Sequence, residues 1–239
     1  MRGQAAFVTT HWSVVLTAGR SDTTRAHAAL SRLCETYWYP LYAFIRRQGH
    51  NPHDAQDLTQ EFFARLLAGN WVGDADRTKG HFRTFLLVAL KRFLVNEWDR
   101  LRAQKRGGAH THIPLDTEFA ERRYQVEPEA GVSADKVYER RWALTLLDQT
   151  MSRLRQEFTD AGKLDEFEHL KVFLTVDRGG IAYADIAAQT GMNEGTVRVA
   201  VHRLRRRFRE VFREEIAQTV ASPDEIEAEI RHLVSLLAE

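Results

Sequence analysis

The segment YADIAAQTGMNEGTVRVAVHRLRRRFRE, residues 183–210, constrains the fold of this chain more than any other. Ala187, Gly191 and Val197 are separated by four and then six residues. This spacing is typical of a helix-turn-helix, in which a small residue lies where two helices cross and a glycine supplies the turn. The segment therefore predicts two helices joined by a tight turn, with the second starting near Asn193.

The second helix of this motif is strongly basic. Residues 198–213 hold seven arginines and one glutamate, a net charge of +6, although the whole chain has a formal net charge of only +1. Five of these arginines lie between residues 203 and 209, where they repel one another, and we expect little acid nearby to pair with them. The pattern favours DNA as the ligand over an ordinary helical hairpin with a solvated arginine face.

In a helix-turn-helix the first residues of the second helix enter the major groove, and later basic residues contact phosphates. We predict base contacts for Thr196 and Arg198, and phosphate contacts for the arginines of residues 203–209. The residues predicted to bind DNA are Asn193, Glu194, Thr196, Arg198, His202, Arg203, Arg205, Arg206 and Arg207.

Charge is distributed unevenly over the rest of the chain. Residues 76–106 hold nine lysines or arginines against three acids, a second balance of +6, whereas residues 219–239 hold five acids against one arginine. Two separate basic segments indicate that one polyanion is contacted at two places.

Apolar spacing predicts an all-α chain. Leu58, Phe62 and Leu66 form a helical stripe behind the start signal of Asn51 and Pro52, while Pro40 is expected to kink the helix before it. We predict two helical domains joined by a flexible linker, the second containing the helix-turn-helix, plus an extra C-terminal amphipathic helix. The predicted ranges are 1–103, linker 104–135, 136–218 and C-terminal extension 219–239.

The C-terminal extension carries an apolar stripe formed by Ile226, Ile230, Leu233 and Leu237. A helix of about sixteen residues is marginal alone in water, so we expect it to fold back onto one of the two domains. Its negative charge also suggests that it screens the arginine helix. A docking helix for another protein is the alternative.

Several classes are disfavoured by what the sequence lacks. It has no long apolar run for a membrane span or signal peptide, and its single cysteine, Cys34, predicts a cytoplasmic protein without disulfides. His110 and His112 form the densest histidine cluster, but no cysteine or second carboxylate pair lies at metal-ligand spacing. With no phosphate loop or nucleophile motif, we expect neither an enzyme nor a cofactor.

The segment of residues 183–210 resembles the DNA-binding region four of bacterial sigma factors, through Tyr183, Ile186, the turn glycine and Gly195-Thr196-Val197. Region two of the same family is similar to two stretches of the first half, DAQDLTQEFFARLL and HFRTFLLVALKRFLVNEWDR. With these two regions and a linker, the chain resembles the extracytoplasmic-function (ECF) group. The resemblance covers residues 27–103 and 136–213.

The resemblance implies a non-catalytic partner of core RNA polymerase and promoter DNA, held silent by an anti-sigma factor or other inhibitor. Region two would dock on polymerase through Asp54, Asp57 and Glu61, and region four would bind the upstream (−35) element. For the downstream (−10) element, which region two opens, the implied contacts are Asn70, Trp71, Lys79, Arg83, Lys91, Arg92 and Arg100.

Two alternatives stay open at this point. Gln56 stands where the family has an acid, and phosphate on nearby Thr59 would add roughly −1.5 to −2 charges, so Thr59 is a candidate phosphorylation site as well as a plain helical threonine.

The chain as a whole also fits a stand-alone helix-turn-helix regulator whose N-terminal half is a sensor or dimerisation domain.

Overall fold

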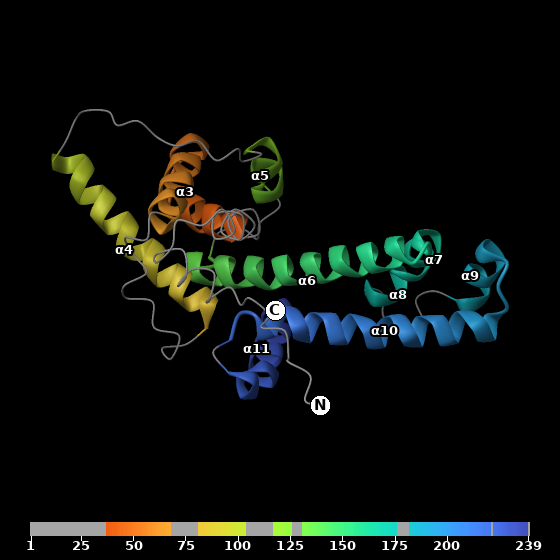
Figure 1. Ribbon diagram of the computed structural model, residues 1–239. Coiled ribbons are helices and arrows are strands. Elements are labelled where there is room, and N and C mark those ends of the chain that lie inside the picture. Colours follow the sequence, from red (N-terminus) through yellow and green to blue (C-terminus); the bar gives the residue numbers. More distant parts are fainter. Residues whose placement is uncertain are drawn as a thin grey trace. The chain divides into compact units, whose positions relative to one another are not determined.

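Every regular element in the described part of the chain is a helix (Figure 1), which confirms the all-α prediction there. The computed structural model describes residues 37–67, 81–103, 117–125, 131–175, 182–220 and 222–238, the side chains of 98–103 and 117–119 excepted. In chain order its helices are residues 37–47, α3 (Pro52–Leu67), α4 (Phe82–Ala103), α5 (Thr117–Tyr124), α6 (Ala134–Asp160), α7 (Leu164–Leu170), α8 (Val172–Thr175), α9 (Tyr183–Thr190), α10 (Glu194–Ala217), the 3₁₀ turn η3 (Pro223–Glu225) and α11 (Ile226–Ala238).

The chain divides into two compact units. The first unit comprises Met1–Thr145 together with Ala217–Glu239, and the second unit comprises Leu146–Ile216. This division differs from the predicted domain ranges because the first part of α6 and the C-terminal extension pack with the N-terminal helices rather than apart from them.

Aromatic side chains fill the core of the first unit. Tyr37 stacks on Trp142 of α6 with ring centroids 4.3 Å apart, and Phe82 of α4 lies 6.0 Å from the same indole. All three side chains are fully buried. The helix of residues 37–47 contains Pro40 without a break, and the residues before 37 lie outside the described part of the chain. These rings join three helices that are distant in sequence.

Trp142→Ala is expected to lower the free energy of unfolding by about 3–5 kcal/mol, because it leaves a cavity where three rings meet. Trp142→Phe should cost less, since the buried indole nitrogen has no hydrogen-bond partner among the described residues and its loss is no penalty. Urea unfolding followed by circular dichroism measures both. Equal losses for the two variants would contradict this account of the core.

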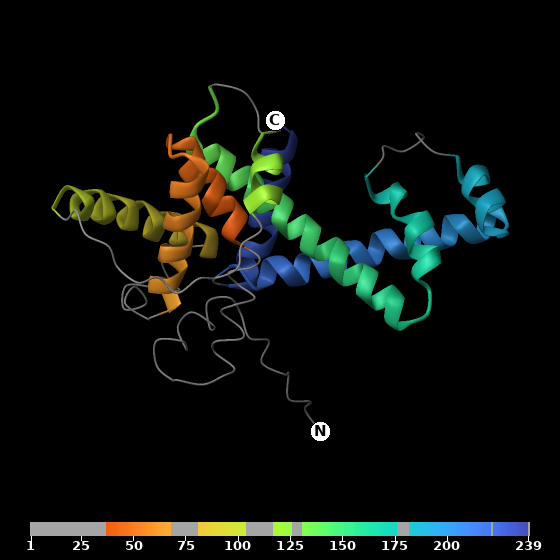
Figure 2. The same ribbon diagram turned by 90° about the horizontal axis from the view of Figure 1, so that it is seen from above.

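Part of the predicted linker is structured. Helix α5, inside residues 104–135, lies against the helix of residues 37–47 (Figure 1 and Figure 2). Arg46 donates to both oxygens of Glu121 at 2.7 and 3.2 Å, and the hydroxyl of Tyr42 donates to the same carboxylate. Burial alone would raise the pKa of Glu121, but the hydrogen bonds from Arg46 and Tyr42 outweigh it and hold that pKa below its usual value.

Because the pKa of Glu121 is lowered, the contribution of this residue to the docking of α5 depends on pH and is lost in acid. Its contribution to stability is present above the unfolded-state pKa of about 4.3 and is lost as pH falls through the lower folded-state pKa. At neutral pH, Glu121→Gln should cost about 1.5 kcal/mol of unfolding free energy. We expect the difference between the two proteins to vanish between about pH 5 and about pH 3, as measured by urea unfolding. A difference that stays constant with pH would be inconsistent with a charged anchor.

The C-terminal extension folds back onto the first unit, as its apolar stripe predicts. Leu233 of α11 is fully buried, while Ile226, Ile230 and Leu237 are half-buried. The backbone N–H of Phe82, at the start of α4, donates to the carbonyl of Thr219 at 2.9 Å. The extension therefore contacts α4 at its N-terminal end.

Candidate nucleic-acid and polymerase interfaces

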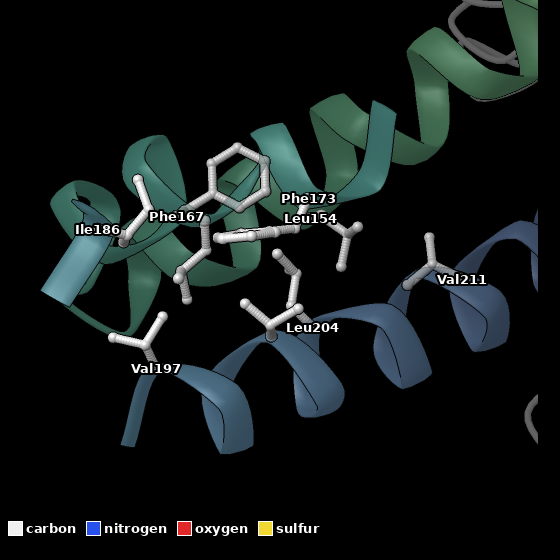
Figure 3. Packing of buried hydrophobic residues seen from close by; sticks show 9 residues of the cluster. Leu154, Phe167, Phe173, Ile186, Val197, Leu204 and Val211 are labelled. Atoms are coloured by element: carbon white, nitrogen blue, oxygen red, sulfur yellow. The ribbon is translucent and has the colours of Figure 1, made fainter. Parts of the chain in front are cut away.

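The second unit contains the predicted helix-turn-helix. Helix α9 ends at Gly191, whose φ of 69° lies in the left-handed region that glycine adopts without strain. Buried Ile186 of α9 and Val197 of α10 belong to the same apolar cluster as Leu154, Phe167 and Phe173 (Figure 3), with Ala187 packed against it. The turn and the core anchor thus occupy the positions that the four-then-six spacing predicts.

Helix α10 begins with a side-chain cap. The amide oxygen of Asn193 accepts hydrogen bonds from the backbone N–H of Thr196 at 2.8 Å and from its hydroxyl at 3.0 Å. This satisfies an N–H group that the first turn of a helix would otherwise leave unpaired. Both side chains are exposed, so the cap defines where the outer face of α10 starts.

Arg198 lies about one turn into this outer face and is held in place. Its guanidinium donates to one oxygen of Glu194 at 2.6 and 3.2 Å and lies over the Tyr183 ring, 5.2 Å from its centroid. The side chain is nevertheless 63% exposed. The hydrogen bond to Glu194 raises the pKa of Arg198, which stays fully charged. To contact a base, Arg198 would have to give up its hydrogen bonds to the Glu194 carboxylate and donate to a base edge instead.

Two of the arginines predicted to contact phosphate, Arg205 and Arg207, have partners within the second unit. Arg205 donates to the carbonyl of Phe173 at 2.9 and 3.1 Å, and Arg207 forms two hydrogen bonds to Glu157, at 2.7 and 2.8 Å. The pairing with Arg207 lowers the pKa of Glu157. Glu210 and Glu214 also lie within 4 Å of Arg207. The expectation that little acid lies near these arginines is therefore wrong, because α6 supplies it from fifty residues away.

The remaining basic side chains point outward along α10. Arg203 and His202 are exposed and have no partner among the described residues, and Arg206 is 75% exposed with one bond to Glu210. Val199, which sequence reasoning missed, is 51% exposed. Val199 lies three, four and seven residues from Thr196, Arg203 and Arg206. This spacing places all four residues on one face of the helix, so the sequence could have indicated Val199.

The predicted polymerase contacts lie at the start of α3. Asn51 caps this helix: its amide oxygen accepts from the N–H of Asp54 at 2.9 Å, and its amide nitrogen donates back to the Asp54 carboxylate at 2.8 Å. Asp54 and Asp57 are exposed, with His53 3.2 Å from Asp57. Glu61 is half-buried and accepts a hydrogen bond from Arg65. The structure thus brings two exposed carboxylates together and ties up the third.

The predicted contacts to the downstream element are only partly described. Asn70, Trp71 and Lys79, together with the side chain of Arg100, lie outside the described residues. Lys91 and Arg92 are exposed on α4, where Lys91 pairs with Asp135 at 2.7 Å. Val88 and Val95 are exposed on the same helix.

Arg83 and Thr59 correct the sequence analysis. The guanidinium of Arg83 is buried and binds Glu229 and Glu139, so no free charge remains for DNA. Thr59 is fully buried in α3, and its hydroxyl donates to the carbonyl of Ala55 at 2.6 Å. A kinase has no access to that hydroxyl in the folded chain, and a phosphate would not fit among buried neighbours.

No group of three or more histidine, cysteine, aspartate or glutamate side chains within the described ranges is placed to hold a metal ion. Cys34, His110 and His112 lie outside these ranges. No helix in the described part of the chain combines the length and the apolar character that crossing a membrane requires.

Comparison with known proteins finds a family match within the first unit. Residues 33–106 match the family model of sigma-70 region 2. The chain is 26% identical over 185 residues to the ECF RNA polymerase sigma factor SigE of Mycolicibacterium smegmatis, covering 76% of this chain and 61%, less than two thirds, of that protein. No solved structure matches. Helix α3, with its exposed acids, and helix α4 both lie in the matched region, so this part of the chain is similar to sigma-70 region 2 and the chain as a whole is similar to an ECF sigma factor.

Proposed function

We propose that this protein is a promoter-specificity subunit, which binds core RNA polymerase and directs it to promoters through two DNA contacts. Helix α3 docks on polymerase, helix α4 contacts the downstream element, and helix α10 binds the upstream element. The observation that carries the proposal is the region 2 match over residues 33–106 in a chain that also contains a basic helix-turn-helix.

Exposed charge supports the polymerase contact. Asp54 and Asp57 are three residues apart at the start of α3, so their carboxylates lie on neighbouring positions of one helix surface. Neither forms an ion pair with a lysine or arginine among the described residues. They therefore remain available to basic side chains of a partner.

The upstream contact is supported by the order of side chains along α10. Thr196, Arg198 and Val199 lie in its first two turns, where a recognition helix meets base edges, and Arg203 and Arg206 follow where phosphates are expected. Each phosphate contact releases counterions, so binding should weaken steeply with salt. Arg205 and Arg207 add stability to this unit rather than charge to the interface.

Reconstituted transcription tests the proposal. Purified protein is added to core polymerase, and run-off transcripts from genomic fragments are mapped. Specific start sites that appear only in the presence of both components are the expected result. A stand-alone regulator would instead bind a specific duplex tightly without polymerase and leave the start sites of core polymerase unchanged, which would overturn the proposal.

A further inference from the structure

A buried ion pair fastens the C-terminal extension to the start of α4. Arg83 donates from Nε and Nη2 to the two oxygens of Glu229 at 2.7 and 3.1 Å, across 146 residues of sequence. The Glu229 side chain is 1% exposed and that of Arg83 is 10% exposed. Two parallel hydrogen bonds between a planar guanidinium and a carboxylate fix orientation as well as distance. The contact therefore determines how the first turn of α4 is directed.

The same turn is held by a backbone hydrogen bond. The N–H of Phe82 has no acceptor within α4 because it lies at the helix start, and it donates to the carbonyl of Thr219 at 2.9 Å. A group that usually needs a local cap is thus satisfied by the C-terminal extension. Residue 82 and residue 83 are both anchored to this one segment.

Helix α6 completes the anchor from the other side. Glu139 accepts from Nη1 of Arg83 at 3.0 Å, and the Tyr138 hydroxyl donates to the backbone carbonyl of Arg83 at 2.8 Å. Two buried histidine nitrogens without hydrogen-bond partners face the same carboxylates: Nδ1 of His81 is 3.5 Å from Glu229, and Nε2 of His232 is 3.9 Å from Glu139. This contact between helices thus contains many polar and charged groups, whereas apolar side chains alone would be enough to pack the helices together.

The anchored end of α4 is the end nearest in sequence to Asn70, Trp71 and Lys79, which are among the contacts implied for the downstream element. Lys79 lies two residues before His81 in sequence, and Lys91 and Arg92 follow about 12 Å along the helix axis from Arg83. A change in the direction of the first turn of α4 therefore displaces both exposed cations on this helix. The extension is thus coupled to the part of the chain that contacts the downstream element.

We infer that Glu229 is a positioning residue for promoter opening. Acting through Arg83, it keeps α4 in the orientation in which its exposed face engages the downstream element. The C-terminal extension is then a working part of promoter opening, although it lies outside the region 2 match. This inference rests on the proposed function.

The experiment compares Glu229→Gln with Glu227→Gln, an exposed glutamate on the same helix. Opening is followed by the fluorescence of 2-aminopurine placed in the downstream element, well below the unfolding midpoint of each variant. Glu229→Gln should open a duplex promoter about tenfold more slowly, while its binding to core polymerase and to upstream duplex is unchanged. Glu227→Gln should behave as the unsubstituted protein, and Glu229→Asp should recover part of the rate.

A promoter with a pre-opened downstream element separates positioning from general damage. On this template Glu229→Gln should approach the unsubstituted rate. An equal loss on both templates, or no loss on duplex, overturns the inference. Should Glu229→Gln not fold, the milder Glu229→Asp, which keeps the charge but shortens the side chain, is expected to slow opening of duplex about threefold; a normal rate would refute the inference. If the unsubstituted protein directs no transcription at all, it is the proposed function that fails.

Discussion

Replacing Asp54 and Asp57 together by arginine is expected to weaken binding to core polymerase by about a hundredfold or more, because like charges then face each other at the contact. Both carboxylates are exposed at the start of α3, so the change alters the surface and not the core. The Asn51 oxygen still accepts from the N–H of residue 54, which preserves the helix start. Surface-immobilised core polymerase measures the affinity, and circular dichroism checks the fold.

The matched control reverses two exposed acids elsewhere. Asp160→Arg with Asp165→Arg adds the same charge to the second unit, away from α3 in sequence, and should leave polymerase binding within about twofold. Undiminished binding by the Asp54 and Asp57 double variant, with normal helical content, would show that α3 is not the docking surface.

Substitution of two arginines on α10 is expected to give two different DNA-binding profiles. Arg198→Ala should cost about 1–3 kcal/mol at particular base pairs, because Arg198 lies in the first turns, where base edges are met. Arg206→Ala should weaken binding to all sequences alike and reduce the salt slope by about 1. Binding to a library of upstream elements, repeated over a salt series, measures both quantities.

Arg207→Ala is the natural control, because this side chain is engaged by Glu157 within the same unit. It should lower the unfolding free energy of the protein while leaving base preference unchanged. If Arg198→Ala and Arg206→Ala gave the same base profile, the proposed docking of α10 in the major groove would have to be abandoned.

Local signals in the sequence predict the helix boundaries well. Asn51 and Asn193 cap the helices that they were expected to start, and Gly191 supplies the left-handed turn. These features depend on a few consecutive residues, so spacing alone reveals them. The helix-turn-helix core follows for the same reason, since Ile186 and Val197 are close in sequence as well as in space.

Pairings over long sequence distances escape this kind of reasoning. Counting charge along residues 198–213 gives no hint that Glu157 of α6 binds Arg207, nor that Glu229 buries Arg83. In α3, the prediction that Leu58 is a core residue places the buried face of the helix one residue away from its observed position. Leu58 is half-buried, whereas Thr59 lies inside, in step with Ala55 and Phe62. The sequence suggests that the apolar Leu58 is buried rather than the polar Thr59, but the helices that pack against α3 determine which of the two is buried.

The first unit is discontinuous, and this has a consequence for the timing of its folding during synthesis. A nascent chain usually folds from its N-terminus while the ribosome is still adding residues. Here the backbone N–H of Phe82 and the guanidinium of Arg83 donate to Thr219 and Glu229. These acceptors lie in residues 217–239, which emerge only after the entire second unit has been made. The newborn protein thus acquires its final form late, and a chain that stalls before that point would carry α3 without the contacts that anchor the start of α4.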